Sequence, residues 1–202
     1  MPGIPTEEAT MIKELIVKNR SCRRFCQDIP VGLETLRELV DLARLSSSPW
    51  NLQPLKFLLC TDPGKNALIF GHLGWAARMK DWPGPSEGER PAAYIVVLGD
   101  PEISKNIRHD QVIAGVSILL GATERGLGGC MLGALKRKAA LYEELGIPTR
   151  YEILLVVGLG KRKESAVIEP VPADGNTAYW TDGGGVHHVP KRSLRDVIIG
   201  EL

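Results

Sequence analysis

The residues best suited to chemistry form an arginine-rich segment, KNRSCRRF, at residues 18–25. It surrounds Ser21 with four cationic side chains: Lys18, Arg20, Arg23 and Arg24. Guanidinium groups and a hydroxyl group are good phosphate ligands, because they donate hydrogen bonds to anionic oxygens. A solvated basic turn has the same composition, so the segment alone leaves both interpretations open.

A second segment, SSSPWNLQP at residues 46–54, places an asparagine and a glutamine between two prolines. Proline restricts the backbone, and the amides of Asn51 and Gln53 supply donors and acceptors that suit the edge of a planar heterocycle. The two amides could equally satisfy each other within a turn. The sequence of this segment does not separate a ligand-binding loop from a simple turn.

A glycine-dense segment, RGLGGCMLG, occupies residues 125–133. It lacks the dinucleotide-binding fingerprint, because Met131 stands where the third glycine belongs, and it lacks the Gly-Lys-Ser/Thr end of a P-loop. Its glycines could allow a ligand to approach the backbone closely. They could equally end a helix and form a tight turn.

A second basic cluster, HHVPKRSL, lies at residues 187–194. His187 and His188 have no spaced carboxylate or cysteine partners of the kind that a metal site needs, so we expect them to form hydrogen bonds. Cys22 and Cys26 lack Cys-x-x-Cys spacing and are interpreted as plain thiols. We expect no metal site, no catalytic triad and no pair of catalytic carboxylates.

Hydrophobic periodicity predicts the elements that must position these segments. We expect helices at residues 6–18, 33–45, 111–125, 138–145 and 194–199, and buried strands at residues 55–60, 93–98 and 152–157. The helix at 111–125 is apolar nearly all round, which places it in the centre of the fold or at a subunit interface. The residues TDPG at 61–64 are interpreted as a turn.

The chain changes character from residue 161 onward, where turn-forming residues dominate and core periodicity is lost. A loose segment of that length is uncommon inside a compact domain, so we expect it to pack across a second subunit. The order of helices and buried strands predicts an α+β or α/β fold, with residues 1–202 forming a single domain.

The composition excludes several classes of function. A formal net charge of +1 over 202 residues argues against a nucleic-acid-binding protein. No segment approaches the roughly 18 apolar residues of a membrane-spanning helix, and no signal peptide is visible. The four cysteines fit a reducing compartment better than a disulfide framework. We therefore expect a soluble cytoplasmic protein without nucleic-acid or membrane partners.

Four of these segments, in this order, resemble the motifs of the nitroreductase family of FMN-dependent oxidoreductases. The family's Arg-Arg-Ser-x-Arg-x-Phe motif corresponds to residues 19–25, and its Pro-Ser-x-x-Asn-x-Gln-Pro motif to residues 47–54. The glycine segment at 126–133 and Pro190-Lys191-Arg192 correspond to two later motifs. Asn19 and Ser47 stand where the family has an arginine and a proline.

The resemblance implies an α+β, nitroreductase-like fold, with a central mixed and mainly antiparallel sheet flanked by helices. Residues 161–202 would form a C-terminal extension that embraces the partner subunit of a homodimer, with FMN at the interface. The FMN-binding residues carried over from the motifs are Arg20, Ser21, Arg23, Ser47, Ser48, Pro49, Trp50, Asn51, Gln53, Leu132, Gly133, Lys191 and Arg192.

The resemblance also assigns roles to these residues. Arg20, Ser21 and Arg192 would bind the FMN phosphate, with Lys191 as a further candidate, and Arg23 would approach the N1–C2=O2 edge of the flavin. Residues 47–51 would line the ribityl chain and ring, with Gln53 nearby. Leu132 and Gly133 would lie beside the ring, where a backbone N–H can reach N5.

The activity implied is hydride transfer from NADH or NADPH onto flavin N5, followed by reduction of a nitroaromatic, quinone or similar planar acceptor. This chemistry needs no side-chain nucleophile. Two alternatives stay open: a flavin-binding or sequestering protein without efficient turnover, and a specialised flavin reductase such as a dehalogenase. Trp75 or Trp82 would line the acceptor pocket, although a surface or interface tryptophan is an equally valid interpretation.

Overall fold

The computed structural model describes residues 6–76, 79, 82–107 and 109–202, with side chains from residue 11 onward. The chain divides into two compact units, Met1–Lys163 and Glu164–Leu202, and each is described by itself. The elements in chain order are α1 (Thr6–Lys18), β1 (Phe25–Cys26), α2 (Leu33–Leu45), η1 (Pro49–Asn51), β2 (Leu55–Cys60), α3 (Pro63–His72), β3 (Ala93–Gly99), α4 (Asp110–Glu124), β4 (Leu127–Leu132), α5 (Lys138–Leu145), β5 (Glu152–Arg162), β6 (Ser165–Pro170), β7 (Trp180–Thr181), β8 (Val186–Lys191) and α6 (Leu194–Val197).

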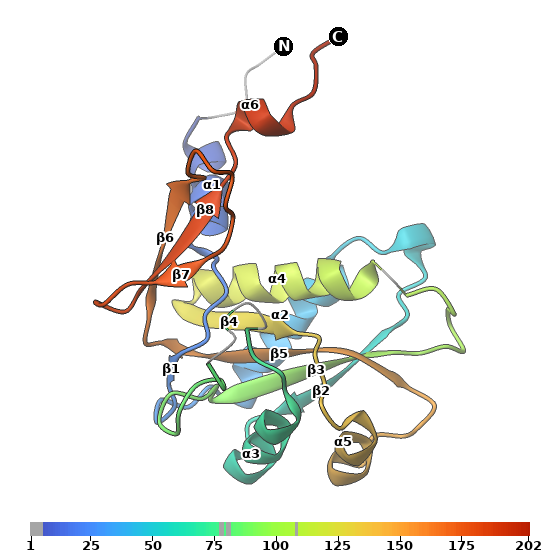
Figure 1. The fold of residues 1–202 in the computed structure, drawn as a ribbon. Coiled ribbons are helices and arrows are strands. Elements are labelled where there is room, and N and C mark those ends of the chain that lie inside the picture. Colours follow the sequence, from blue (N-terminus) through green and yellow to red (C-terminus); the bar gives the residue numbers. More distant parts are fainter. Residues whose placement is uncertain (1–5, 77–78, 80–81, 108) are drawn as a thin grey trace. The chain divides into compact units, whose positions relative to one another are not determined.

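The larger unit is built on a five-stranded sheet whose named strands pair antiparallel, in the order β1-β5-β3-β2 with β4 also on β5. Helices α2 and α4 cover one face, and α3 and α5 lie on the other (Figure 1). Successive residues of a strand point to opposite faces. Ile95 and Val97 therefore join the hydrophobic cluster under α2 and α4, while Tyr94 and Val96 join the cluster under α3 and α5. Burial on both faces explains why β3 is apolar without alternation.

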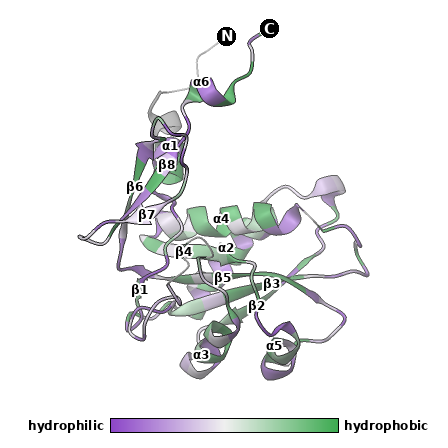
Figure 2. Cartoon of the chain, viewed as in Figure 1, coloured by the Kyte–Doolittle hydropathy of each residue, from purple (hydrophilic) through white to green (hydrophobic). Residues whose placement is uncertain are grey.

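Most elements lie where periodicity predicts them. The bounds of α2, β2 and α5 agree with the predicted ranges, and α4 begins and ends one residue earlier than predicted. The strand predicted at 152–157 continues to Arg162 as β5. Figure 2 shows the hydrophobic residues that run along α4, which is the helix predicted to be apolar nearly all round.

Helix α3 corrects the sequence interpretation, in which TDPG was a turn. Asp62 is the N-cap of this helix, and its Oδ1 accepts a hydrogen bond from the backbone N–H of Lys65 at 2.8 Å. Pro63 occupies the first helical position, where its missing N–H costs nothing. An aspartate side chain that accepts from a nearby backbone N–H, followed by a proline with a fixed φ angle, can start either a helix or a turn. Here the pair starts a helix.

The glycine-dense segment forms β4, and its glycines allow close approach of the protein's own backbone. A Cβ atom at Gly129 would lie 2.8 Å from the carbonyl oxygen of Gly158, and one at Gly128 would lie 2.8 Å from the Cβ of Cys22. The backbone N–H of Cys22 donates to the carbonyl of Gly129 at 2.9 Å. Strand β4 therefore packs tightly between β5 and the segment that follows α1.

The smaller unit begins at Glu164, three residues after the predicted start of the C-terminal extension. It contains a three-stranded sheet in the order β6-β8-β7, in which β6 and β8 are parallel. All of its residues are described, and only His187 and Pro190 among them are buried. With so little apolar burial, polar side-chain contacts must contribute much of the order within this unit.

Candidate functional site

Arg20 lies just after α1, on the segment that packs against β4. Its Nη2 donates to the carbonyl of Ile16 at 2.5 Å. Arg162, the last residue of β5, fixes the same turn, because its Nη2 donates to the carbonyls of Lys18 and Arg20 at 3.3 Å each. The Nε of Arg162 also donates to the carbonyl of Leu127 at 3.4 Å, which ties the turn to β4.

The guanidinium of Arg20 carries an uncompensated charge. Its Nε atom is buried and has no hydrogen-bond partner within the part of the chain that the structure describes. Burial, followed by the positive charge of Arg162, lowers the pKa of Arg20 below its usual range. No carboxylate pairs with it among the described side chains. Two guanidinium groups that pair with no carboxylate among the described side chains, one with an unused buried donor, form a site that an anion would stabilise.

The other members of the basic cluster have different surroundings. Lys18 pairs with Glu14 at 3.4 Å on the exposed side of α1, and Arg24 pairs with Glu89 at 3.2 Å. Ser21, the residue after Arg20 in the chain, is exposed and forms a β-bridge with Gly129 of β4. Arg23 is half-buried. The structure therefore holds Ser21 against β4 and gives Arg24 a structural ion pair.

The loop at residues 46–54 has an unusual backbone. Trp50, Asn51 and Gln53 have φ angles of 53°, 55° and 51°, in the left-handed region that side chains disfavour. Backbone strain of this kind costs on the order of 1–3 kcal/mol per residue and clusters at ligand sites. Trp50 is 93% exposed despite its size. The loop is therefore held in a shape that local sequence preference does not favour.

A buried carboxylate holds this loop. The Ser48 hydroxyl donates to Asp110 Oδ1 at 2.6 Å and accepts from the backbone N–H of Gln53 at 2.9 Å. Gln53 Nε2 donates to the carbonyl and the Oδ1 of Asn51 at 3.2 and 3.1 Å. The two amides thus contact each other, as the turn interpretation predicts, while Ser48 anchors the loop to α4. A cavity of about 140 Å³ lies behind the loop and is lined by Ser46, Ser47, Ser48, Gln53, Phe57 and Asp110 among others.

Leu132 is the last residue of β4, and Gly133 follows it. Gly133 and Gln111, near the start of α4, line the same cavity. Leu132 is buried, whereas Gly133 is exposed and lines an open cavity of about 500 Å³. Gln111 also lines this cavity, and its Oε1 is buried without a partner among the described residues. The first two residues of α4 therefore contribute to both candidate regions: Asp110 anchors the loop, and Gln111 lines the cavity at Gly133.

Asp110 and Gln111 are residues that the sequence analysis missed. The signal available was a polar pair, Asp-Gln, at the start of an otherwise apolar helix. A helix N-terminus favours a carboxylate, so the pair reads equally well as ordinary helix initiation. Only the contact between Asp110 and Ser48, 62 residues apart in the chain, reveals its role in the loop.

The sequence predicts that Trp75 or Trp82 lines an acceptor pocket. Trp75 is 7% exposed and packs in the core with Phe70, at 5.6 Å between ring centroids. Trp82 is half-buried, meets Trp75 edge to face at 6.5 Å and lies under the guanidinium of Arg24. Trp75 is thus a core residue. A pocket role for Trp82 stays a prediction.

Lys191 and Arg192 lie in the smaller unit, at the end of β8 and just after it, and both are exposed. The carbonyl of Lys191 accepts a hydrogen bond from the N–H of Val171 at 3.1 Å, which continues the pairing of β6 with β8. Their assignment to the same site as Arg20 stays a prediction.

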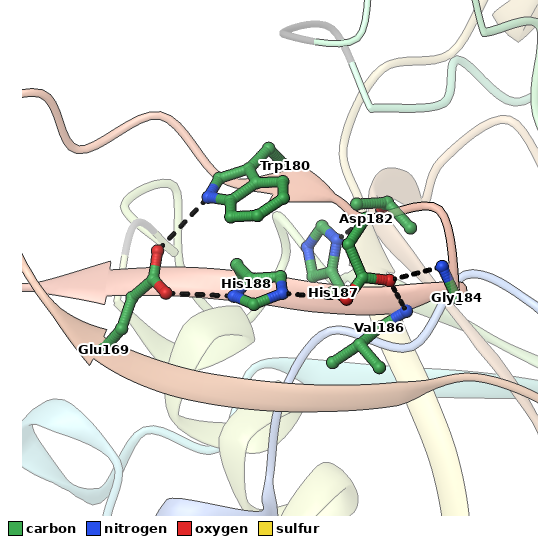
Figure 3. Close-up of polar contacts among 8 residues, drawn as sticks. Glu169, Trp180, Asp182, Gly184, Val186, His187 and His188 are labelled. Carbon is green, nitrogen blue, oxygen red and sulfur yellow. Dashed lines mark hydrogen bonds and ion pairs between the residues drawn. The ribbon is translucent and has the colours of Figure 1, made fainter.

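His188 holds the strands of this unit together (Figure 3). Its Nδ1 lies 2.9 Å from Oε2 of Glu169 on β6, and its Nε2 lies 3.3 Å from Oδ2 of Asp182. The indole of Trp180 stacks on the imidazole at 3.9 Å and donates through Nε1 to Glu169 at 3.2 Å. The hydrogen bond to Glu169, followed by the one to Asp182, raises the pKa of His188. Among the described residues, no group of three or more His, Cys, Asp and Glu could hold a metal ion.

Known proteins resemble this chain in sequence and in fold. The model of the nitroreductase family matches residues 16–161. The NADPH-flavin oxidoreductase of Vibrio harveyi is 25% identical over 173 residues, which cover 78% of this chain and 68% of that protein. The oxygen-insensitive NADPH nitroreductase of Helicobacter acinonychis is 25% identical over 189 residues, which cover 76% of this chain and 89% of that protein. The structure of an FMN-dependent nitroreductase from Clostridium difficile superimposes with a TM-score of 0.61 at 25% identity, covering 75% of this chain and 87% of that one.

The contact between Ser48 and Asp110 predicts a change in amide exchange. In Asp110→Ala the Ser48 hydroxyl loses its acceptor, so the N–H of Gln53 should exchange about tenfold faster, which corresponds to one hydrogen bond. Asp110→Asn keeps an acceptor oxygen and should retain most of the protection. Hydrogen exchange followed by NMR measures this amide directly. Equal protection of Gln53 in the wild type and in Asp110→Ala would show that Asp110 does not hold the loop.

The cluster around His188 predicts a pH dependence of the smaller unit. Contacts in the folded state raise the pKa of His188. The contribution of His188 to the stability of the smaller unit is therefore fully present below the unfolded-state pKa of about 6.5. It is lost as the pH rises through the higher pKa of the folded state. The pKa of Glu169 is lowered by the hydrogen bond to His188, and that of Asp182 by the N–H of Val186 and then by His188. The stabilisation by these carboxylates is present above about pH 4 and is lost on further acidification.

The smaller unit should therefore be most ordered between about pH 5 and 6.5. An NMR titration of the imidazole protons of His188 should give a midpoint above that of an exposed histidine. In Glu169→Gln the midpoint should fall, because the largest cause of the shift is removed. An unchanged midpoint in this variant would contradict the arrangement in Figure 3.

Proposed function

Since the chain belongs to the nitroreductase family, we propose that it is an FMN-dependent oxidoreductase that uses NADH or NADPH to reduce nitroaromatic, quinone or similar planar acceptors. The names of its relatives support this, since they include an NADPH-flavin oxidoreductase and an FMN-dependent nitroreductase. When bound, FMN supplies the redox chemistry, accepting a hydride from the nicotinamide and passing electrons to the acceptor. The observation that carries the proposal is the uncompensated guanidinium of Arg20.

The surroundings of Arg20 fit the phosphate group of FMN. The buried Nε of Arg20 needs an acceptor, and phosphate oxygens are strong acceptors that also neutralise charge. Ser21, the next residue in the chain, is exposed, and Arg162 holds the turn through its bonds to the carbonyls of Lys18 and Arg20. We assign Arg192, with Lys191 as a further candidate, to the same phosphate on the basis of the family motif.

The loop at 46–54 is proposed to line the ribityl chain and the flavin ring through residues 47–51, with Gln53 nearby. Its strained backbone and its anchor on Asp110 support this role, because a ligand-binding loop works best when it is ordered beforehand. Arg23 is assigned to the N1–C2=O2 edge, where its charge would stabilise negative charge on the ring. Neither role requires a side-chain nucleophile or base.

Leu132 and Gly133 are proposed to lie beside the flavin ring. A Cβ atom at Gly133 would meet no atom within 4 Å, so the backbone there is open on one side. The adjoining cavity of about 500 Å³ is large enough for a planar group. The unpartnered Oε1 of Gln111 would meet a donor on whatever occupies this cavity.

A homodimer is part of the proposal. Helix α1 exposes Ile12, Ile16 and Val17, and α4 exposes Val112 and Val116, each by 40% or more of its surface. Apolar helix faces exposed to this degree are typical of protein–protein interfaces. These faces support a symmetric contact between two copies of the chain, as the family resemblance implies.

The four cysteines support a location in a reducing compartment. All four cysteines are thiols in the structure, and burial raises the pKa of Cys60, which keeps it protonated and unreactive. A chain with buried thiols suits a reducing compartment, which supports the cytoplasmic location that we propose. Among the described residues, no helix has the length and apolar character needed to cross a membrane.

Replacing Arg20 tests the phosphate assignment. In Arg20→Ala the dissociation constant for FMN should rise about ten- to a hundredfold, which is the usual value of a hydrogen bond to a charged group. Arg37→Ala is the matched control, because Arg37 is an exposed arginine that pairs only locally with Glu34. Flavin fluorescence quenching measures both constants, and circular dichroism confirms that the variants fold.

The loaded protein then tests the activity. Anaerobic NADH or NADPH should bleach its visible absorbance, and a nitroaromatic or quinone should restore it. A chain that takes up no FMN would contradict the whole assignment. A yellow protein that does not bleach would favour the flavin-sequestering alternative over the reductase.

A further inference from the structure

The open cavity beside Gly133 lies within the larger unit and has an apolar wall. Its volume is about 500 Å³. Four of its lining residues are apolar: Ile107, Leu135, Ile153 and Leu154. Ile107 and Ile153 are 7% and 2% exposed, so this wall is part of the core and does not depend on a ligand for its position. A fixed apolar wall suits the face of a small planar ring.

The same cavity is also lined by charged side chains. Lys105, between β3 and α4, and Lys138, the first residue of α5, are both exposed. Lys138 Nζ lies 3.8 Å from Oε1 of Glu152, which also lines the cavity. Lys105 forms no ion pair with any carboxylate among the described side chains. The described lining therefore carries two positive charges and one negative charge.

Contacts within the larger unit hold the segments that carry these residues. Arg150 Nη1 donates to Oε2 of Glu102 at 2.7 Å, which ties the segment that contains Lys105 to the residues before β5. The N–H of Lys136 donates to the carbonyl of His72 at 2.8 Å, which ties the segment between Gly133 and α5 to the end of α3. The backbone on both sides of the cavity is thus fixed, and the lysine side chains are its adjustable part.

Both lysines can serve a ligand that occupies this cavity. A lysine ammonium sits on a flexible four-carbon stem, so it can turn toward an anionic group in a cavity that its own residue lines. Gly133, which we assign to the edge of the flavin ring, lines the same cavity. A molecule bound here would therefore lie beside the flavin and within reach of Lys105 and Lys138.

We propose that this cavity selects planar acceptors that carry an anionic substituent, such as an aromatic carboxylate. The ring of the acceptor would pack on the apolar wall, and its carboxylate would bind Lys105 and Lys138. A neutral acceptor of the same shape would gain only the apolar contacts. This inference rests on the proposed function, because it takes Gly133 to be a neighbour of the flavin.

Benzoate and benzamide test the selection without turnover, because they have nearly the same shape and differ in charge. Both are titrated into the oxidised, FMN-loaded, full-length protein at neutral pH, and the change in flavin absorbance gives each dissociation constant. At low ionic strength benzoate should bind about fivefold tighter than benzamide, which is the upper end for a partly exposed ion pair. In 1 M salt, where the Debye length is about 3 Å, most of this preference should disappear.

Substitutions at the two lysines locate the selection. Lys105→Gln should lower the preference for benzoate about two- to threefold, and the double variant with Lys138→Gln should remove it. The affinity for neutral benzamide should stay as in the wild type, which shows that the cavity is intact. Lys56→Gln is the matched control, because Lys56 is an exposed lysine on β2 outside the lining of this cavity, and it should keep the full preference.

The outcomes separate this inference from the proposed function. Equal binding of benzoate and benzamide by the wild type, a preference that the double variant keeps, or the same loss in Lys56→Gln would each overturn the inference. Reduction of 4-nitrobenzamide by the wild type with NADH or NADPH would then leave the proposed function standing. A wild type that reduces neither 4-nitrobenzamide nor 4-nitrobenzoate would contradict the proposed function and the inference with it.

Discussion

The segment that carries Arg20 depends on a backbone contact with β4 that only glycine permits. Cys22 donates to the carbonyl of Gly129 at 2.9 Å, and a Cβ atom at either Gly128 or Gly129 would meet other atoms at less than 3 Å. This contact places the turn after α1 at the end of β5, where Arg162 holds two of its carbonyls. Arg20 is thereby fixed near the guanidinium of Arg162, and its own buried Nε has no acceptor among the described residues. We assign an anion site to Arg20 for these two reasons.

The start of α4 connects the remaining parts of the candidate site. Asp110 anchors a loop in which three residues adopt left-handed backbone angles, and Gln111 lines the cavity at the end of β4. A buried carboxylate at a helix N-terminus is stabilised by the helix dipole, which makes it a firm anchor. The loop at residues 46–54 is therefore ordered by a rigid element, and the flavin that we propose for it would meet a surface already in shape.

The sequence was sufficient to predict the elements whose apolar pattern is strong, such as α2, β2, β3 and α5, because burial on a face imposes periodicity. It missed α3, where Asp62 and Pro63 start a helix with residues that also start turns. It missed the sheet of the smaller unit, where β6 and β8 mix apolar residues with polar ones and prolines, and where His188 contacts Glu169 across the two strands. Nothing in the sequence around Trp50 predicts its left-handed backbone conformation. The role of Asp110 could not be predicted either, because it depends on a contact with Ser48, 62 residues away. Family motifs identified the Arg20 segment and the loop, yet only the structure shows the charge balance around Arg20.

The central claim is that Arg20 recognises the phosphate group of FMN, and comparing FMN with riboflavin tests it most directly because the two differ only by that group. Fluorescence titration of both flavins against the wild type and Arg20→Ala forms a complete cycle. The wild type should bind FMN about ten- to a hundredfold tighter than riboflavin, and most of this preference should vanish in Arg20→Ala. If Arg20→Ala weakened both flavins equally, or left the preference for FMN intact, the phosphate would be bound elsewhere and the account would be wrong.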